Sequence, residues 1–322
     1  MQNKLFRFSD IFKETIWGGK RILPYKGLTA DDRQIGESWE LSGIADHESV
    51  VVSGAYDGLT LPALIDKGGA QLLGKSNYCH FGNNFPLLVK FIDATQALSV
   101  QVHPNDALAR RRHGCPGKTE MWYVVDGTPD AYLLSGFNRV MTQNEYAARV
   151  ADNTLADVLR RYNVKAGDVY FLPAGQVHSI GAGCFICEIQ QSSDITYRIY
   201  DFGRRDAQGK TRQLHVSEAM DAINFDFLPP ELHFDIKDNQ PNEIVQCTHF
   251  TTNAFRLTQP IERSYLGLDS FVILVCTKGK CHVACGEESL ELAEGHTLLV
   301  AAEAQSIKLT PDPQTHLLEA YV

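Results

Sequence analysis

The sequence predicts a mainly β protein made of two jelly-roll barrels, with a minority of α-helix. Short apolar runs rich in β-branched and aromatic residues recur along the chain, separated by Gly, Pro, Asn and Asp. The chain has 322 residues, which is enough for two domains. The strand pattern of its first part returns in its last part, and many short strands in repeated units are typical of jelly rolls.

Each predicted strand is an apolar run bounded by turn residues. We expect strands at 85–94, 97–104, 121–127, 168–175, 185–191 and 195–203. Helical patterns are fewer. They predict helices over 61–68 and 142–164, the second with Thr142 as its N-cap and Glu145 as the capping-box partner.

A cluster of Pro, Asp and Asn residues at 225–243 predicts a domain boundary. We expect a catalytic domain at 1–234, which includes the N-terminal segment, and a second domain at 235–322. The repeat pairs these positions of the two domains: Gly127 with Gly279, Gly167 with Gly295, Glu120 with Val272, and His178 with Ser306. The second copy therefore lacks metal-ligand residue types, and we expect it to be metal-free and structural.

Charge and cysteine content limit the function. The net charge is -9, from 30 Lys and Arg against 39 Asp and Glu, so we expect no nucleic-acid partner. The sequence has neither a long apolar run nor a signal-peptide core, so we expect no membrane association and a cytoplasmic location. The eight cysteines are irregularly spaced, which predicts reduced thiols. We also expect a monomer or a weak homo-oligomer.

Four polar residues form a candidate metal site. Gln101 and His103 lie two apart in a predicted strand, so their side chains share one face. Glu120 opens the next strand, and His178 follows a turn-forming segment. Two imidazoles, a carboxylate and an amide oxygen suit Zn²⁺, with Mn²⁺, Fe²⁺ or Co²⁺ as alternatives. A single strand histidine is more often a hydrogen-bonded core residue, so the interpretation depends on the whole set.

The spacings around these residues match the two motifs of the cupin superfamily. The first motif ends with Glu120 and, seven positions later, Gly127. The second consists of Gly167, Pro173, Gly175 and His178. Gln101 stands where most cupins have a histidine, so this chain is identified as a variant of the usual pattern.

That variant resembles one family in particular. The segments LSVQVHPND (98–106), GKTEMWYVVDG (117–127) and SSDITYR (192–198), with IWGG (16–19) and GESWELSG (36–43), closely resemble the type I phosphomannose isomerases of the short bacterial branch. The resemblance implies cupin-type barrels and the interconversion of mannose 6-phosphate and fructose 6-phosphate through an enediol or enediolate. Its small-molecule partner would be a sugar phosphate.

The resemblance also implies roles for individual residues. One zinc per chain would be bound by Gln101, His103, Glu120 and His178. Arg198 matches the family's active-site arginine, Glu188 a carboxylate proposed in proton transfer, and Ser99 and Lys118 substrate-side positions. Lys90 lies in a predicted strand and is expected to face the same cavity.

Several alternatives stay open from the sequence. Arg198 has the alternative of a surface ion pair with Asp194 or Asp201, and Glu188 that of an exposed strand residue. Lys90 in an apolar strand is also typical of an edge-strand guard. The competing functions are a metal cupin of the oxygenase type, which identification of the metal would reveal, and a non-catalytic sugar-binding cupin.

Overall fold

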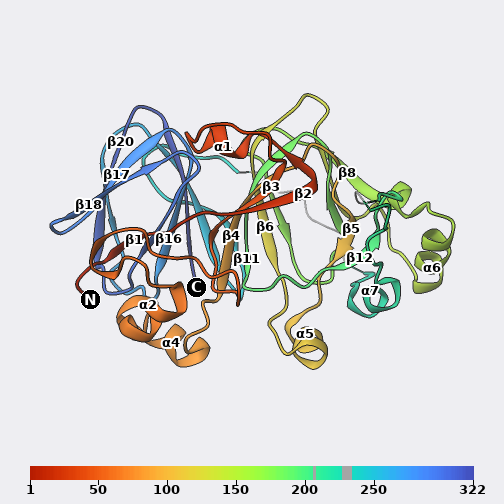
Figure 1. Ribbon diagram of the computed structural model, residues 1–322, viewed down its shortest axis with the longest axis horizontal. Coiled ribbons are helices and arrows are strands. Elements are labelled where there is room, and N and C mark those ends of the chain that lie inside the picture. The colour runs from red at the N-terminus through yellow and green to blue at the C-terminus, as the bar shows by residue number, and fades with distance from the viewer. Residues whose placement is uncertain (206–207, 227–233) are drawn as a thin grey trace.

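The computed structural model describes residues 1–205, 208–226 and 234–322. These residues form two β-barrels that lie side by side, with the second drawn mostly in blue in Figure 1. Each barrel has one larger and one smaller sheet, and the paired strands within every sheet are antiparallel. The predicted mainly β fold with two jelly-roll barrels is confirmed.

The first barrel combines a six-stranded and a five-stranded sheet. In spatial order the larger sheet contains β2 (Ile11–Gly19), β3 (Ile35–Leu41), β4 (Leu87–Asp93), β11 (Cys184–Gln191), β6 (Glu120–Gly127) and β9 (Val169–Leu172). The smaller sheet contains β12 (Tyr197–Tyr200), β5 (Val100–Val102), β10 (His178–Ile180), β7 (Tyr132–Phe137) and β8 (Leu159–Asn163). All six strands expected from the sequence are present, most of them shorter than expected.

The second barrel repeats this order. Its larger sheet contains β1 (Leu5–Arg7), β19 (Thr297–Val300), β16 (Val272–Lys278), β21 (Thr315–Tyr321), β14 (Thr251–Leu257) and β13 (Asn242–Gln246). Its smaller sheet contains β15 (Ile261–Ser264), β20 (Ser306–Pro311), β17 (Lys280–Cys285) and β18 (Glu288–Ala293). The orders β4-β11-β6-β9 and β14-β21-β16-β19 correspond strand by strand, as do β5-β10-β7-β8 and β15-β20-β17-β18.

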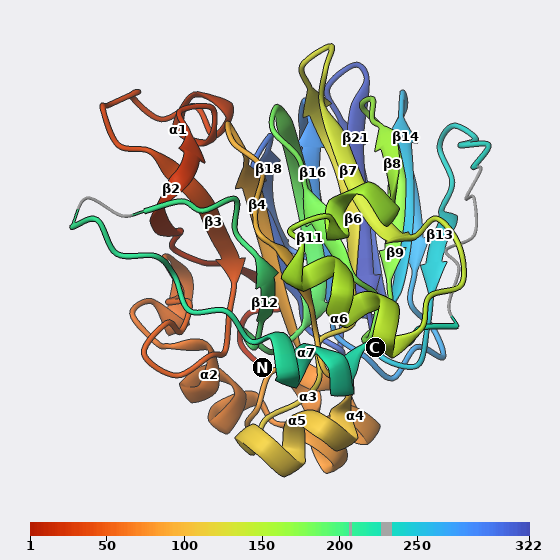
Figure 2. The same cartoon turned by 90° about the vertical axis from the view of Figure 1, so that its right-hand side faces the viewer.

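The helices are short and lie outside the barrels. They are α1 (Ile22–Tyr25), α2 (Leu61–Gly68), α3 (Ala70–Leu73), α4 (Lys75–Phe81), α5 (Asp106–His113), α6 (Gln143–Ala151) and α7 (Val216–Ala222), with 3-10 turns at η1 (Gly54–Tyr56) and η2 (Leu155–Val158). Figure 2 shows α2, α3, α4 and α5 gathered at one end of the sheets. Among the described residues, no helix is long and apolar enough to cross a membrane.

The prediction of a helix over 142–164 is wrong for the second half of this range. Helix α6 ends at Ala151, and Asn153 then takes a left-handed conformation with φ of 57°, which breaks the helical path. The following residues form η2 and then β8, which pairs with β7. The N-cap is confirmed, because Thr142 Oγ1 accepts the Glu145 N–H at 3.1 Å. The Glu145 carboxylate pairs with Arg139 rather than completing a capping box.

The N-terminal strand joins the second barrel, although the expected domain boundaries of 1–234 and 235–322 would place it in the first domain. Strand β1 pairs with β19 of the second barrel, where Leu5 lies opposite Val300. It covers what would otherwise be an open edge of that sheet. The other strands of the second barrel lie between 242 and 322. Part of the expected boundary region, 227–233, lies outside the described residues, and the boundary itself stays a prediction.

The larger sheets of the two barrels pack against each other. Their outer faces share one apolar core, which includes Phe91 and Ile189 of the first barrel and Phe271 and Ile273 of the second. Because strand side chains alternate, the inner face of the first barrel carries a different set of residues, such as Trp122. The predicted metal ligands lie on this inner side.

The cysteines are free thiols, as expected. Cys184 and Cys187 are both buried, Cys184 in the core of the first barrel and Cys187 in the core between the barrels. They face opposite sides of β11, so this CxxC segment forms neither a redox pair nor half of a metal site.

Candidate active site

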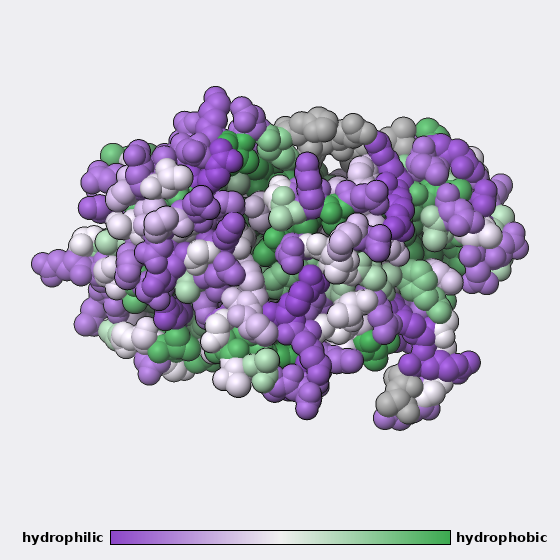
Figure 3. Space-filling view, turned by 90° about the horizontal axis from the view of Figure 1, so that it is seen from above, coloured by the Kyte–Doolittle hydropathy of each residue, from purple (hydrophilic) through white to green (hydrophobic). Residues whose placement is uncertain are grey.

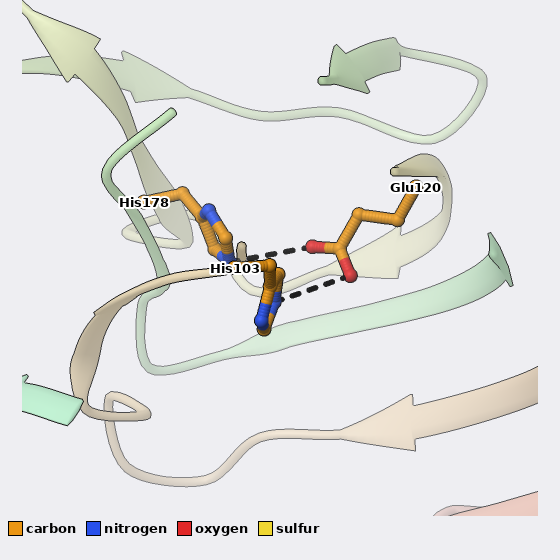
Figure 4. Close-up of side chains that lie close together, drawn as sticks. All are labelled: His103, Glu120 and His178. Carbon is orange, nitrogen blue, oxygen red and sulfur yellow. Dashed lines mark ion pairs between the residues drawn. The ribbon is translucent and has the colours of Figure 1, made fainter. Parts of the chain in front are cut away.

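Three predicted ligands converge inside the first barrel. His103 follows β5, Glu120 begins β6 and His178 begins β10, so three strands of two sheets supply them. Their ligand atoms all lie within 4.8 Å of one another. Glu120 Oε1 lies 3.3 Å from His178 Nε2, and Glu120 Oε2 lies 3.5 Å from His103 Nε2. Figure 4 shows the carboxylate facing both rings.

Main-chain carbonyls fix the orientation of both imidazoles. His103 Nδ1 lies 2.9 Å from the carbonyl oxygen of Ile195, and His178 Nδ1 lies 2.8 Å from that of Gln176. A carbonyl oxygen only accepts, so Nδ1 carries the proton in each ring and donates it. The Nε2 lone pairs are therefore free to face Glu120. This is the arrangement by which proteins prepare a histidine to bind a metal.

Burial keeps both imidazoles neutral. It lowers the pKa of His103 well below its ordinary value, and the nearby Lys118 charge acts in the same direction. Burial likewise lowers the pKa of His178 to about 4. A protonated ring would have no lone pair at Nε2, so neutral rings are the form that can coordinate a metal.

The residues of the site fit a cation. Oε1 of Glu120 is buried without a hydrogen-bond partner among the described residues. The Lys118 ammonium group contacts Glu120 Oε2 and lies 3.2 Å from His103 Nε2. The Lys118 ammonium group therefore places a positive charge beside Glu120 and His103, two of the three candidate ligands. An unpartnered buried carboxylate oxygen and two aligned lone pairs fit a divalent metal with nitrogen and oxygen ligands.

Gln101, the fourth predicted ligand, lies at the edge of this group. Its Nε2 is 3.4 Å from His178 Nε2, and its Oε1 accepts the Ser99 hydroxyl at 3.3 Å. Gln101 pairs with His178 across β5 and β10. The side-chain amide is therefore close enough to join the ligand set, and rotating it by half a turn would present its oxygen to the site.

Glu188, Lys90 and Lys118 form a buried charged cluster beside the metal ligands. Glu188 Oε1 lies 3.4 Å from Lys90 Nζ and 3.8 Å from Lys118 Nζ. Burial acts to raise the pKa of Glu188, but the charges of Lys118 and Lys90 outweigh it and lower the pKa to about 2. Burial and the Glu188 charge raise the pKa of Glu120. The exposed alternative for Glu188 and the edge-strand alternative for Lys90 are both wrong, because these side chains lie inside the barrel.

Two tryptophans and a further glutamate complete this cluster and were not predicted as site residues. Trp122 Nε1 donates to Glu188 Oε2 at 2.8 Å, and Trp39 Nε1 donates to Glu37 Oε2 at 2.6 Å. Lys90 lies between the two carboxylates, 3.6 Å from Glu37 Oε2. The sequence held a signal for this pair, because Glu37 and Trp39 are two apart in the strand-like segment GESWELSG.

Arg198 lies beside the site but its side chain turns elsewhere. It faces Gln101 across β12 and β5. Its Nη1 donates to the carbonyl of Gln213 at 3.0 Å, while Nε is buried without a hydrogen-bond partner in the described part of the chain. Burial lowers its pKa, and the charge of Arg212 adds to that effect. The surface pair with Asp201 is not formed, because that carboxylate binds Arg204 and Arg212.

Several known proteins are similar to this chain in sequence and in fold. A sequence model of the family "Phosphomannose isomerase type I, catalytic domain" matches residues 5–127. The chain is 35% identical over 306 residues to mannose-6-phosphate isomerase ManA of Bacillus subtilis, which covers 94% of each chain. The chain belongs to the type I phosphomannose isomerase family. It is also 32% identical over 316 residues to a mannose-6-phosphate isomerase of Streptococcus mutans, covering 97% of this chain and 96% of the relative.

A solved mannose 6-phosphate isomerase has the same fold. The crystal structure of a mannose 6-phosphate isomerase from Bacillus subtilis superposes with a TM-score of 0.90 at 26% identity. The superposition covers 99% of this chain and 100% of that one. The likeness therefore includes both barrels and the N-terminal strand that joins the second.

The second barrel of this phosphomannose isomerase family member keeps one feature of the site without its ligands. Val272 is buried at the position that corresponds to Glu120, and Ser306 is exposed at the position of His178. Glu319 faces Leu274 as Glu188 faces Trp122. In the part of the chain that the structure describes, His103, Glu120 and His178 form the only group suited to a metal.

Proposed function

We propose that this chain is a zinc-dependent mannose-6-phosphate isomerase that interconverts mannose 6-phosphate and fructose 6-phosphate. The observation that carries the proposal is the convergence of the His103 and His178 Nε2 atoms on the Glu120 carboxylate in a chain of this family. Family membership favours an isomerase over an oxygenase-type cupin. The buried cluster of Glu188 with two lysines argues against a non-catalytic sugar-binding cupin, because such a cluster is typical of an active site.

Gln101, His103, Glu120 and His178 would hold one zinc ion per chain. When bound, zinc supplies Lewis-acid polarisation of the sugar oxygens and helps to orient the sugar. The carbonyls of Ile195 and Gln176 keep both imidazoles in the coordinating tautomer. Nitrogen and oxygen ligands in this number suit zinc better than Mg²⁺ or Ca²⁺, which prefer oxygen alone.

Isomerisation moves a proton between C1 and C2 of the sugar through an enediol or enediolate, and we assign the proton transfer to Glu188. This carboxylate is ionised, and its Oε1 is buried without a hydrogen-bond partner among the described residues. Trp122 holds the other oxygen, so Oε1 is the atom that can accept the proton. A substrate phosphate near Lys90 and Lys118 would offset their charges and make Glu188 a stronger base.

The remaining residues bind the substrate and stabilise its charge. Lys90 and Lys118 are buried cations on the inner face of the barrel, and Ser99 adds a hydroxyl beside Gln101. These three groups suit a phosphorylated sugar. Arg198 would turn from the Gln213 carbonyl to stabilise oxyanion charge, since its Nε has no hydrogen-bond partner among the described residues. A monomer or weak homo-oligomer would suffice, because all of these residues come from one chain.

The test combines metal analysis with a coupled assay of mannose 6-phosphate conversion to fructose 6-phosphate. The purified protein should contain about one zinc per chain and show activity that a chelator removes and zinc restores. His103→Ala and His178→Ala should lose both metal and activity. His282→Ala is the matched control, because His282 is exposed on β17 of the second barrel. Full metal content in the His103→Ala/His178→Ala double variant, or an inactive zinc-loaded protein, would overturn the proposal.

A further inference from the structure

A cavity of about 790 Å³ lies between the two barrels, away from the metal ligands. The outer faces of β6 and β9 supply Tyr123 and Phe171 to one wall, and β13 and β14 supply Ile244 and Ala254 to the other. A second cavity of about 550 Å³ shares Tyr123 and His316 with the first, so the two form one continuous cleft. Figure 3 looks onto the molecule from above and shows apolar residues interspersed with hydrophilic ones, including near the middle.

The cleft follows the edge strand β9 of the larger sheet: Phe171 lines it from the outer face, and Tyr170, which pairs with Trp122, lines it from the inner face. Along β6, Glu120 and Trp122 point into the first barrel, whereas Tyr123 lines the cleft. No predicted metal or substrate residue lines either cavity. A ligand in the cleft would therefore be separate from the proposed substrate, and it would touch both barrels. Small-molecule sites occur preferentially in such positions between domains.

Positive charge gathers along this cleft although the whole chain carries -9. The larger cavity is lined by Arg160, Arg161, Lys165 and Arg256, against one carboxylate, Asp168. The adjoining cavity adds two cations, Arg21 and Lys278, against two carboxylates, Asp126 and Glu294. Arg256 already forms an ion pair with Asp238. Lys165 and Lys278 are exposed, and neither ammonium group forms an ion pair within the described residues. A local excess of cations in an acidic protein attracts anions to that place.

His316 marks where the positive charges meet. It lines both cavities and is partly buried. Burial lowers its pKa, and the charges of Lys278 and Arg256 lower it further. Both cations pair with His316 across the sheet, Arg256 from β14 and Lys278 from β16. An anion seated among these three groups would gain charge-assisted hydrogen bonds from them.

The cleft also offers aromatic surface. Besides Tyr123 and Phe171, it is lined by Tyr170 and Phe234. The rings of Tyr162 and Tyr170 meet edge to face with centroids 5.4 Å apart. Phosphate alone would need only the cations. Aromatic walls beside cations suit a ligand that joins a phosphate group to a planar ring, because such a ring stacks on aromatic side chains.

We propose that the cleft between the barrels binds a nucleoside phosphate, with the phosphate on the cations near His316 and the base against the aromatic walls. The cavity volume lies within the range of about 300–1,000 Å³ that small-molecule sites occupy. The occupant contacts both barrels, so its binding is sensitive to their mutual position. This site is independent of the proposed isomerase activity, and it has no role in the chemistry inside the first barrel.

Titration calorimetry on the whole protein tests the proposal, with adenosine 5′-monophosphate as the probe. We expect saturable binding of one nucleotide per chain, weaker in high salt. Ribose 5-phosphate and inorganic phosphate should bind less tightly, because they lack the base. The double variant Lys165→Gln/Lys278→Gln should weaken nucleotide binding by about tenfold or more. The double variant Lys67→Gln/Lys308→Gln removes the same charge from exposed positions that do not line the cleft, and should bind as the unaltered protein does.

Two further measurements separate this site from the active site. Chelator-treated protein should still bind the nucleotide, and mannose 6-phosphate should not displace it. Displacement by mannose 6-phosphate, equal binding by both double variants, or no saturable binding at millimolar nucleotide would overturn the proposal. Equal affinity for ribose 5-phosphate would also overturn it, since a sugar phosphate would then be the ligand class. The isomerase assay is scored separately, so either proposal can fail alone.

Discussion

At the scale of single residues, the candidate metal site is prepared by groups that do not bind the metal. The carbonyls of Ile195 and Gln176 set the tautomers of His103 and His178. Burial keeps both rings neutral. The free energy that would be needed to orient the rings on metal binding is therefore supplied in advance by folding. The same logic applies to Glu188, which an indole and two ammonium groups hold in place.

Arg198 gives the first prediction. If it stabilises oxyanion charge, Arg198→Ala should lower kcat by a factor on the order of 10²–10³, as for the loss of one oxyanion donor. Metal content should stay unchanged, because a guanidinium is not a ligand of zinc. Arg198→Lys should restore little, since one ammonium cannot reproduce the planar fork. A raised KM with near-normal kcat would instead make Arg198 a phosphate-binding residue.

Trp122 gives the second prediction. Trp122→Phe removes the N–H that donates to Glu188 Oε2 while keeping an aromatic ring in the core. We expect kcat to fall by about ten- to a hundredfold with KM little changed, because the carboxylate loses its orientation. Trp17→Phe is the matched control, since Trp17 is buried in the same core as Trp122 but makes no hydrogen bond to the carboxylates of the cluster among the described residues. Equal losses in both variants, measured by steady-state kinetics, would point to general loss of packing.

At the scale of elements, patterns among residues close together in the sequence predicted more of the structure than features that depend on distant residues. The four candidate ligands and six strands of the first barrel could be predicted from residue spacing, because strand alternation and turn residues act locally. The prediction of a helix over the whole of 142–164 is wrong, because β8 is stabilised by pairing with β7, which lies at a distance in the sequence. The contacts of Trp122 with Glu188 and of Trp39 with Glu37 depend on rotamers and burial, which composition does not reveal.

Asp201, directly after β12, gives a pH prediction. Hydrogen bonds from Arg212 and Arg204 outweigh burial and lower the pKa of this carboxyl. Its folded pKa is below the unfolded value, so its stabilisation is present above about pH 4 and is lost as the pH falls through the folded pKa. Asp201→Asn should lower the free energy of unfolding by about 1–2 kcal/mol at pH 7. In urea titrations the difference should shrink below about pH 4; a constant difference would contradict the assignment.

At the scale of the whole molecule, the second barrel supports the first through the core between their large sheets. Its own interior is closed by a buried ion pair. The Arg263 guanidinium binds both oxygens of Glu319 at 2.9 Å, and Tyr265 and Asn253 donate to the same carboxylate. Three hydrogen-bonding neighbours, one of them an arginine, surround this carboxylate and leave it no open ligand position. This arrangement agrees with the expectation of a metal-free, structural barrel, which remains a prediction.

Glu319 gives the last prediction. Glu319→Gln should lower the free energy of unfolding by about 3 kcal/mol, because it leaves the Arg263 charge without its partner in a largely buried place. Zinc content and kcat at a temperature where the variant is folded should be unchanged. Glu262→Gln is the control, since Glu262 is exposed on β15, the strand that also carries Arg263. Loss of metal from the folded Glu319→Gln variant would show that the second barrel contributes to the site.

The pairing of β1 with β19 has a consequence for biosynthesis. Leu5 is synthesised well before its partner Val300, because most of the described chain lies between them. Strand β1 must therefore wait, with its hydrogen-bonding edge unpaired, until β19 has been synthesised. Such a distant closure is slow to form. Nascent chains stalled before β19 should expose this edge to chaperones, and full-length chains released from the ribosome should bury it.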